Sequence, residues 1–239
     1  EPGVFHDGAC CSKQTEQIRC PCMLASGTER SSLVSVFEWT VFPLIAGGGT
    51  ALAIWAIKVG HPPLGVYVLV QGVAVLTVAV LERFVPHSRK WLVSHGDLPA
   101  DAGHSLVSAV AIPELLKPFV HAAGVATAAW LSAQLGYGFW PHAWPLAAQL
   151  LLALVVGEFG QYWVHRLGHE WHWLWRFHAT HHSAPRLYWL NAGRFHPVDY
   201  LLQFLAWYWV LVAMGAGIEV IVLFSWFTAI HGIFQHCNL

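Results

Sequence analysis

The stretch 145–182, PLAAQLLLALVVGEFGQYWVHRLGHEWHWLWRFHATHH, decides the fold of this chain. Its first part, Pro145–Val164, is an apolar run that is long enough for a helix crossing the hydrocarbon core of a bilayer. Five histidines follow at once in two groups: His165 and His169, then His178, His181 and His182. We therefore expect a membrane-spanning helix that ends in a histidine-rich segment at the membrane surface.

The spacing of these histidines indicates a metal site. Residues four apart share one face of a helix, so His165 and His169 can reach the same ion. His178 repeats this geometry with His181 and with His182, and two neighbouring positions on a helix point about 100° apart. Neutral imidazole is the commonest protein ligand for iron, copper and zinc. The pattern favours a site with more than one ion over a row of interfacial histidines.

The composition is that of a membrane protein. Hydrophobic residues make up 56% of the chain and charged residues only 10%, against about 25% charged residues in a soluble domain. The 14 tryptophans suit the belts that aromatic residues form at the two membrane surfaces. A formal net charge of −1 offers no basic surface for a nucleic acid, so the bilayer is the expected partner.

Apolar runs predict an all-α, polytopic membrane protein with about four spans and a C-terminal hydrophobic hairpin. The four predicted spans are Val41–Ile57, Leu64–Leu81, Ser105–Leu131 and Pro145–Val164. Pro113, Glu114, Lys117 and Pro118 interrupt the third span, so we expect it to be either kinked or partly re-entrant. Tyr200–Met214 and Ile218–Ile230 are each short for a crossing and predict a hairpin that dips into one leaflet.

Basic residues predict the orientation in the membrane. Arg83, Arg89 and Lys90 follow the second predicted span, and four arginines follow the fourth: Arg166, Arg176, Arg186 and Arg194. Lysine and arginine are enriched on the cytoplasmic side of membrane proteins. We therefore expect an integral protein of the bacterial inner membrane or the endoplasmic reticulum, with its histidine-rich metal site facing the cytoplasm.

The first forty residues differ from the rest of the chain. Residues 1–40 are polar and hold four cysteines, Cys10, Cys11, Cys20 and Cys22, whose spacing matches no familiar zinc finger. We interpret residues 1–40 as a loose polar tail and residues 41–239 as one membrane-embedded domain.

Other kinds of metal site fit the pattern less well. A zinc peptidase needs the sequence His-Glu-x-x-His, but Arg166, Leu167 and Gly168 separate His165 from His169. The Glu-x-x-His pairs of carboxylate di-iron bundles do not occur in the sequence either. A membrane haem or metal-binding protein for electron transfer is an alternative from a different class, although bis-histidine haem ligation needs two facing histidines on separate spans.

With these residues in view, the chain resembles the fatty acid hydroxylase and sterol desaturase superfamily of integral membrane oxygenases. The resemblance covers roughly Asp101–Leu239 and rests on four stretches: Glu158–Glu170, Trp173–Ser183, Asn191–Pro197 and His231–Asn238. It implies two non-haem iron ions in a cytoplasmic histidine-rich site, where dioxygen is used to hydroxylate or desaturate a lipid of the fatty-acyl or sterol type. It also implies a separate cytochrome or ferredoxin that supplies electrons.

The residues and the resemblance together give a candidate site. The expected metal ligands are His165, His169, His178, His181, His182, His196, His231 and His236, and the resemblance places a ligand at His236. The candidate catalytic residues are Glu158, Glu170 and Asn191. Glu158 is a carboxylate at membrane depth, where ionisable residues mark functional sites. Glu170 either orients a ligand ring or pairs with Arg166, four residues before it.

The end of the chain departs from the superfamily pattern. In that pattern another His-x-x-His-His box follows the position of His236, whereas this sequence ends at Leu239. We therefore expect an incomplete ligand set and a domain that is C-terminally incomplete. A non-catalytic, truncated member of the superfamily is a further alternative.

Overall fold

The computed structural model describes residues 32–239. The chain divides into two compact units, residues 1–37 and 38–239, and all but the first few described residues belong to the second. Helices and connecting turns make up the described residues, without a strand among them, so the predicted all-α class is confirmed. The four cysteines of the predicted tail lie outside the described residues.

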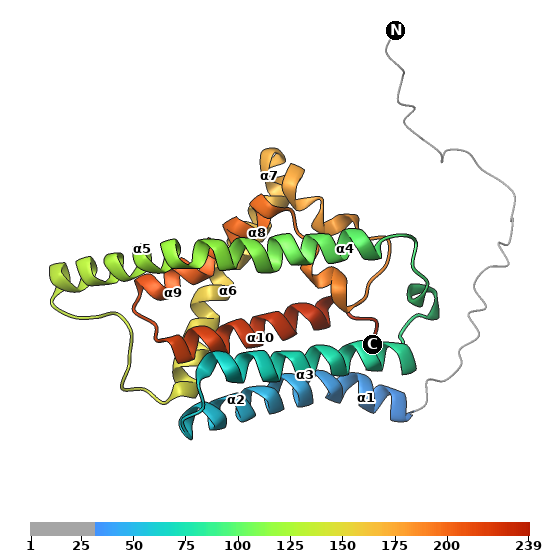
Figure 1. The fold of residues 1–239 in the computed structure, drawn as a ribbon, viewed down its shortest axis with the longest axis horizontal. Coiled ribbons are helices and arrows are strands. Elements are labelled where there is room, and N and C mark those ends of the chain that lie inside the picture. Colours follow the sequence, from blue (N-terminus) through green and yellow to red (C-terminus); the bar gives the residue numbers. More distant parts are fainter. Residues whose placement is uncertain (1–31) are drawn as a thin grey trace, which may run out of the picture. The chain divides into compact units, whose positions relative to one another are not determined.

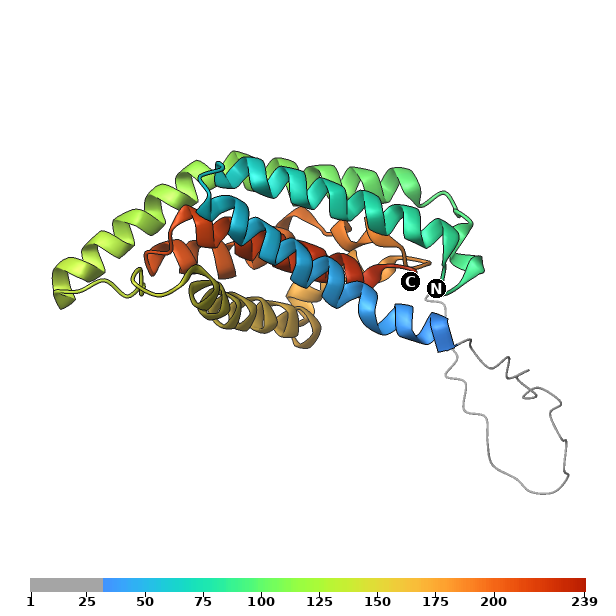
Figure 2. The same cartoon turned by 90° about the horizontal axis from the view of Figure 1, so that it is seen from below.

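The first hairpin is built from apolar helices. In chain order it contains α1 (Ser32–Phe42), the π-helix η1 (Pro43–Gly47), α2 (Gly48–Lys58) and α3 (Pro63–Phe84). α3 returns beside α2, as Figure 2 shows. The buried residues Val66, Val70, Ala74 and Val78 recur every four positions along α3, which gives this helix one face for packing.

A long helix and its successor support the candidate site. α4 (Leu98–His104), the π-helix η3 (Ser105–Ala111) and α5 (Ile112–Leu135) follow one another without a break. α5 ends at Gly136, whose φ of 79° is a left-handed conformation that glycine adopts without strain. α6 (Leu146–Glu170) contains the apolar run and then the first two histidines of the boxes.

Short helices form a cap after α6. We call residues 171–196 the cap, and its helices are α7 (His172–His178), η4 (His181–Ser183) and η5 (Trp189–Gly193). The elements after the cap are α8 (Pro197–Phe204), η6 (Leu205–Trp209), α9 (Val210–Ala213) and α10 (Ile218–His236). A single turn, η2 (Arg89–Leu92), lies in the loop between α3 and α4.

Five of the described helices are long and apolar enough to cross a membrane. They are Val36–Lys58, Pro63–Phe84, Leu98–Leu135, Leu146–Glu170 and Ile218–His236. This result differs from the expected C-terminal hairpin of two short segments. Only Pro197–Ala213 is short, and the helix that follows has spanning length. The apolar run stops at Ile230, but the helix continues to His236 because its backbone hydrogen bonds do not depend on side-chain polarity.

α10 lies at the centre of the core. It packs against α2, α3 and α6, and its ribbon lies next to α3 in Figure 1. Its residues Leu223, Phe224, Trp226 and Ile230 are at most 1% exposed. Glycines allow close contacts here, since a Cβ on Gly157 of α6 would lie 2.4 Å from the Phe224 ring and one on Gly49 of α2 would lie 2.2 Å from the Trp226 ring. Small residues at helix contacts are a common means of close packing in membranes.

Candidate metal centre

Four histidines from three elements meet at the end of α6. His165 and His169 lie four residues apart in α6, His178 is the last residue of α7, and His182 belongs to η4. The chain turns at Trp171, whose extended backbone (φ −103°, ψ 110°) allows α7 to fold back against α6. One ring nitrogen of each histidine lies within 4.8 Å of the others. The structure thus brings together four of the eight predicted ligands.

A second pair of histidines lies next to this group. Nε2 of His181 is 3.3 Å from Nε2 of His236, the last residue of α10. The His181 ring stacks on Phe195 at a centroid distance of 4.3 Å and lies 5.8 Å from the His178 ring. Because 55 positions separate His181 from His236, their contact depends on how α10 packs against the cap.

In three of these histidines, a hydrogen bond at Nδ1 decides which ring nitrogen is free to bind a metal. The partners of Nδ1 are Asp199 Oδ2 for His178 (2.9 Å), the Arg194 carbonyl for His181 (3.3 Å) and the Gly232 carbonyl for His236 (2.9 Å). An ionised carboxylate and a carbonyl can only accept, so each Nδ1 carries a proton and donates it. Each Nε2 therefore keeps a lone pair.

The free nitrogens converge in a way that suits metal ions. The Nε2 lone pairs of His181 and His236 face each other at 3.3 Å, a repulsive arrangement that a cation relieves. The Nε2 atoms of His178 and His182 are 3.0 Å apart, and those of His165 and His169 are 3.2 Å apart. Metal-binding histidines usually donate their other N–H to a carboxylate or carbonyl, as three of these do. The donor set therefore fits iron, copper or zinc.

The two histidines of η4 favour the neutral form that binds metal. Burial, followed by the nearby His236, His182 and His178, lowers the pKa of His181 to about 3. Burial and the neighbouring histidines also lower the pKa of His182. At neutral pH both rings are therefore uncharged, as ligation requires.

A comparison with protein families bears on the site directly. Residues 150–239 match the family model of the fatty acid hydroxylases. This chain is a relative of the fatty acid hydroxylases. The match begins inside α6 and includes all eight predicted ligands, so the resemblance inferred from the histidine boxes is confirmed.

Two curated relatives are similar in sequence. An ornithine lipid hydroxylase of Rhizobium tropici is 38% identical over 167 residues, which are 69% of this chain and 50% of that relative. A cholesterol 25-hydroxylase-like protein of Caenorhabditis briggsae is 24% identical over 110 residues, which are 39% of this chain and 37% of that relative. The chain thus spans 50% of the length of the first relative and 37% of the length of the second. No solved structure gives a significant match.

In this relative of the fatty acid hydroxylases, a buried carboxylate ties the cap to α4. Asp101 is fully buried and accepts hydrogen bonds from the Arg194 guanidinium at 2.6 Å and the Tyr188 hydroxyl at 2.7 Å. Arg194 also donates to the Thr180 carbonyl, directly before His181. Because the carbonyl of Arg194 is the partner of His181, Asp101 helps to fix the orientation of that ring.

Asp97 and Arg186 form a second buried ion pair, in which Nε of Arg186 lies 2.6 Å from Oδ2 of Asp97. Burial alone raises the pKa of Asp97, but bonds from Arg186, the His95 backbone N–H and the Ser94 hydroxyl outweigh it and hold this pKa at about 2. A carboxylate whose pKa is lowered by folding stabilises the fold above its unfolded pKa of about 3.9. This contribution is lost as the pH falls towards 2.

Asp97→Asn is expected to destabilise the protein by roughly 3 kcal/mol at neutral pH, because it leaves the buried Arg186 without its partner. The difference from wild type should shrink between about pH 4 and pH 2, where the wild-type carboxylate itself becomes protonated. Thermal unfolding in detergent at a series of pH values measures both effects. The control is Glu170→Gln, which removes an exposed pair with Arg166 and should change stability little. Equal losses in the two variants would contradict the buried-pair argument.

Two of the predicted ligands lie apart from the other six. His196 is the N-cap of α8, where its Nδ1 accepts the Val198 backbone N–H at 3.1 Å. His231 of α10 lies among aromatic side chains, with ring centroids 5.9 Å from Phe42 and 6.3 Å from Phe227. Among the described residues, neither has a ring contact with the histidines of the two boxes, and their ligand roles stay predictions.

The candidate catalytic residues have different surroundings. Glu170 is exposed and forms an ion pair with Arg166 at 2.8 Å, which was the alternative reading of this residue. Asn191 is buried, and its side-chain amide donates to the Arg186 carbonyl, so it holds the backbone at η5. Glu158 is half-buried in α6, on the turns before the first histidine. Their catalytic roles stay predictions.

Sequence reasoning missed the residues that support the ligands. Asp199, the partner of His178, is 5% exposed in the first turn of α8. Because acidic residues are common in the first turn of any helix, Asp199 carried no distinct signal in the sequence. His104 of α4 was not among the predicted site residues, and its Nδ1 lies 2.9 Å from the Phe195 carbonyl of the cap.

Proposed function

We propose that this chain carries the metal centre of a membrane-bound lipid hydroxylase. The observation that carries the proposal is the convergence of six histidines whose Nε2 atoms approach in pairs at 3.0–3.3 Å. The family match and the two relatives, one named as a hydroxylase and the other as hydroxylase-like, support a reaction on a lipid. The reaction proposed is hydroxylation or desaturation with dioxygen at a site that holds two non-haem iron ions.

The residues present divide into two ligand sets. His165, His169, His178 and His182 would hold one ion, and His181 with His236 would contribute to the other. When bound, the iron ions would supply the redox chemistry that activates dioxygen towards a C–H bond. The protein itself orients the imidazoles, through Asp199 for His178 and the Arg194 carbonyl for His181.

The substrate we propose is a lipid that reaches the site from the bilayer. The relatives are named for an ornithine lipid and for cholesterol, which share an apolar body and a polar group. Large apolar side chains such as Leu69, Leu115 and Leu151 are exposed on helices of spanning length, where lipid chains would surround them. The bilayer is thus both the solvent and the source of substrate.

The electron donor and the orientation follow from charge and chemistry. Activation of dioxygen consumes electrons, so we propose a separate cytochrome or ferredoxin as the donor. Arg83 lies in the last turn of α3, Arg89 and Lys90 lie between α3 and α4, and the cap holds Arg176 and Arg194. Under the positive-inside rule these segments, and with them the metal centre, face the cytoplasm.

A haem protein for electron transfer fits the same residues poorly. A haem held by two histidines needs their rings on opposite faces of the macrocycle. Here the His165 and His178 rings are 4.5 Å apart, and those of His169 and His182 are 4.6 Å apart, with direct contact between them. Such contacts leave no space for a macrocycle between the rings.

The test is to follow labelled oxygen into lipid. Purified protein is loaded with ferrous iron and supplied with ferredoxin, a reductant, isotopically labelled dioxygen and membrane lipids, and the products are analysed by mass spectrometry. Labelled hydroxyl groups on a lipid would support the proposal. Reduction and reoxidation of the bound metal without any oxidised lipid would favour electron transfer instead. An iron-loaded protein that neither cycles nor oxidises lipid would favour a non-catalytic member.

A further inference from the structure

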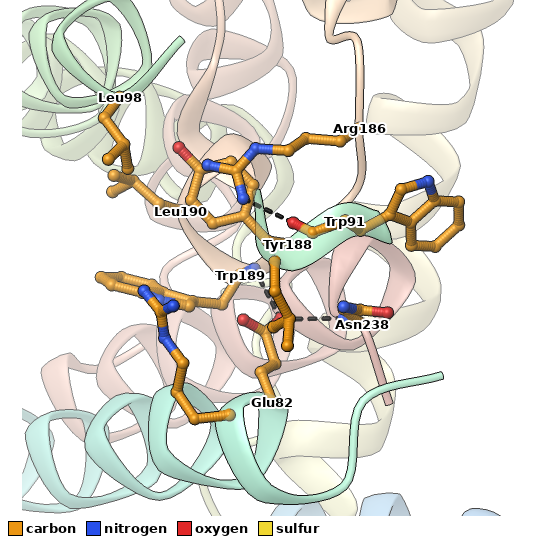
Figure 3. Close-up of a pocket in the computed structure, with 10 residues that line it drawn as sticks. Glu82, Trp91, Leu98, Arg186, Tyr188, Trp189, Leu190 and Asn238 are labelled. Atoms are coloured by element: carbon orange, nitrogen blue, oxygen red, sulfur yellow. Dashed lines mark hydrogen bonds between the residues drawn. The ribbon is translucent and has the colours of Figure 1, made fainter. Parts of the chain in front are cut away.

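A pocket outside the metal centre lies where α3, the loop after it and the cap meet. Its volume is about 150 Å³. The lining residues are Glu82, Arg83, Trp91, Leu92, Leu98, Arg186, Tyr188, Trp189, Leu190 and Asn238 (Figure 3). The lining therefore combines a carboxylate, two guanidinium groups and three aromatic rings.

The carboxylate of Glu82 has one oxygen without a protein partner. Glu82 is 4% exposed, and its Oε1 accepts the backbone N–H groups of Trp189 and Asn238, both at 2.8 Å (Figure 3). No described residue donates a hydrogen bond to Oε2. Oε2 is therefore free to accept hydrogen bonds from a ligand that brings N–H groups into the pocket.

The two arginines of the pocket differ in whether a nearby carboxylate neutralises their charge. Arg186 is already neutralised, since it pairs with Asp97, donates to the Trp91 carbonyl at 2.6 Å and lies 3.9 Å above the Tyr188 ring. Arg83 is exposed and has no carboxylate within 4.0 Å among the described residues. The pocket therefore offers one negative group, Glu82, and one positive group, Arg83, for an outside ligand.

The position of the pocket suits a lipid head group. It lies at the end of the spanning helix α3, where Phe84 is 80% exposed and Leu98 is 42% exposed. Tryptophan and arginine side chains at the end of a span are typical of head-group depth. Asn238 of the pocket follows His236 by two residues, so the pocket and the metal centre lie at the same end of α10.

We infer that this pocket binds the zwitterionic head group of a lipid, with an ammonium group at Glu82 and an acidic group at Arg83. The ammonium would satisfy Oε2 of Glu82 and lie beside the rings of Trp91 and Trp189, which attract cations through their π faces. The inference rests on the proposed function, since the lipid held here would be the substrate of the neighbouring metal centre.

The test measures binding with a zwitterionic probe and matched analogues. The probe is Nα-dodecanoyl-lysine, which carries a free ammonium, a free carboxylate and an acyl chain. Its neutral analogue is acetylated at the ammonium and amidated at the carboxylate, and free lysine lacks the chain. Full-length protein in nanodiscs is titrated with each compound while tryptophan fluorescence is recorded. We expect the zwitterion to bind about tenfold or more tightly than the neutral analogue.

Two variants separate recognition from folding. Glu82→Gln keeps an acceptor for the two backbone N–H groups but removes the charge, and should lower the affinity for the zwitterion by about tenfold or more. Arg83→Gln changes an exposed side chain and should lower it as well. The control is Arg89→Gln, an equal change of charge in the loop that follows α3, at a residue that does not line the pocket.

Each outcome is decisive for the pocket. Unchanged affinity in both Glu82→Gln and Arg83→Gln would overturn the inference, and so would free lysine binding as tightly as the acylated probe, which would indicate a soluble ligand. In hydroxylation assays Glu82→Gln should raise KM with little change in kcat. Charge-dependent binding without any hydroxylation would leave the pocket standing while the proposed function fails. Hydroxylation with an unaltered KM in Glu82→Gln would contradict the inference about the pocket and leave the proposed function standing.

Discussion

Replacing His178 with alanine is expected to remove most of the bound metal and to abolish lipid hydroxylation. The side chain is 1% exposed, and its ring lies 4.5–4.8 Å from the rings of His165, His169 and His182. Without this central imidazole, the first ligand set loses a donor that every other member contacts. The metal content should fall by about half or more. Turnover should fall by more than the roughly 10- to 100-fold that outer partners of ligands contribute.

His172→Ala is the matched control for this prediction. His172 belongs to the same helix, α7, but it is exposed and stands outside the group of converging nitrogens. Elemental analysis of the purified variants and mass spectrometry of the lipid products give the two readouts. Equal metal content in His178→Ala and wild type would show that the histidine boxes do not form the metal centre.

The second large effect is expected from Asp199→Asn. Asp199 Oδ2 accepts the Nδ1 proton of His178 at 2.9 Å, which leaves Nε2 free to bind metal. An amide at this position can donate its own N–H to Nδ1 and so favour the tautomer with the proton on Nε2. We expect metal affinity to fall by roughly 10- to 100-fold, measured by competition with a chelator of known affinity.

Gln203→Ala tests whether the effect of Asp199 is merely structural. Gln203 donates to the other oxygen of the same carboxylate, Oδ1, at 3.3 Å. Its removal disturbs the packing around Asp199 but leaves the bond to His178 in place, so metal affinity should stay close to wild type. If Gln203→Ala loses as much affinity as Asp199→Asn, the carboxylate acts through packing and not through the tautomer of His178.

The fold could be predicted from the sequence as far as local patterns reach. Apolar runs of spanning length indicated the helices, and the structure contains a helix at each predicted span. The last helix was predicted too short, because the count of apolar residues stopped before its polar end at His236. The packing of α10 between α2, α3 and α6 was not predicted, since contacts among helices of similar hydrophobicity leave no distinct pattern in one sequence.

The sequence by itself determined the group of four histidines. His165 and His169 are four residues apart in α6, so helical geometry alone brings them onto one face. His178 ends α7 and His182 lies in η4, so their approach at 3.0 Å also needs the short turn between these elements. The connection at Trp171 is short, so α7 has to fold back upon α6 directly after it. Local geometry and a short connection were enough to make this part of the site predictable.

Only the tertiary structure decided which further residues join the site. His196 and His231 carry the same side chain as the ligands, yet one caps α8 and the other lies among aromatic rings. His236 meets His181 across 55 positions, and Asp101 meets Arg194 across 93. Contacts at such separations form only when whole helices pack, because the free energy that fixes them comes from burial along the helices and not from the residues in contact.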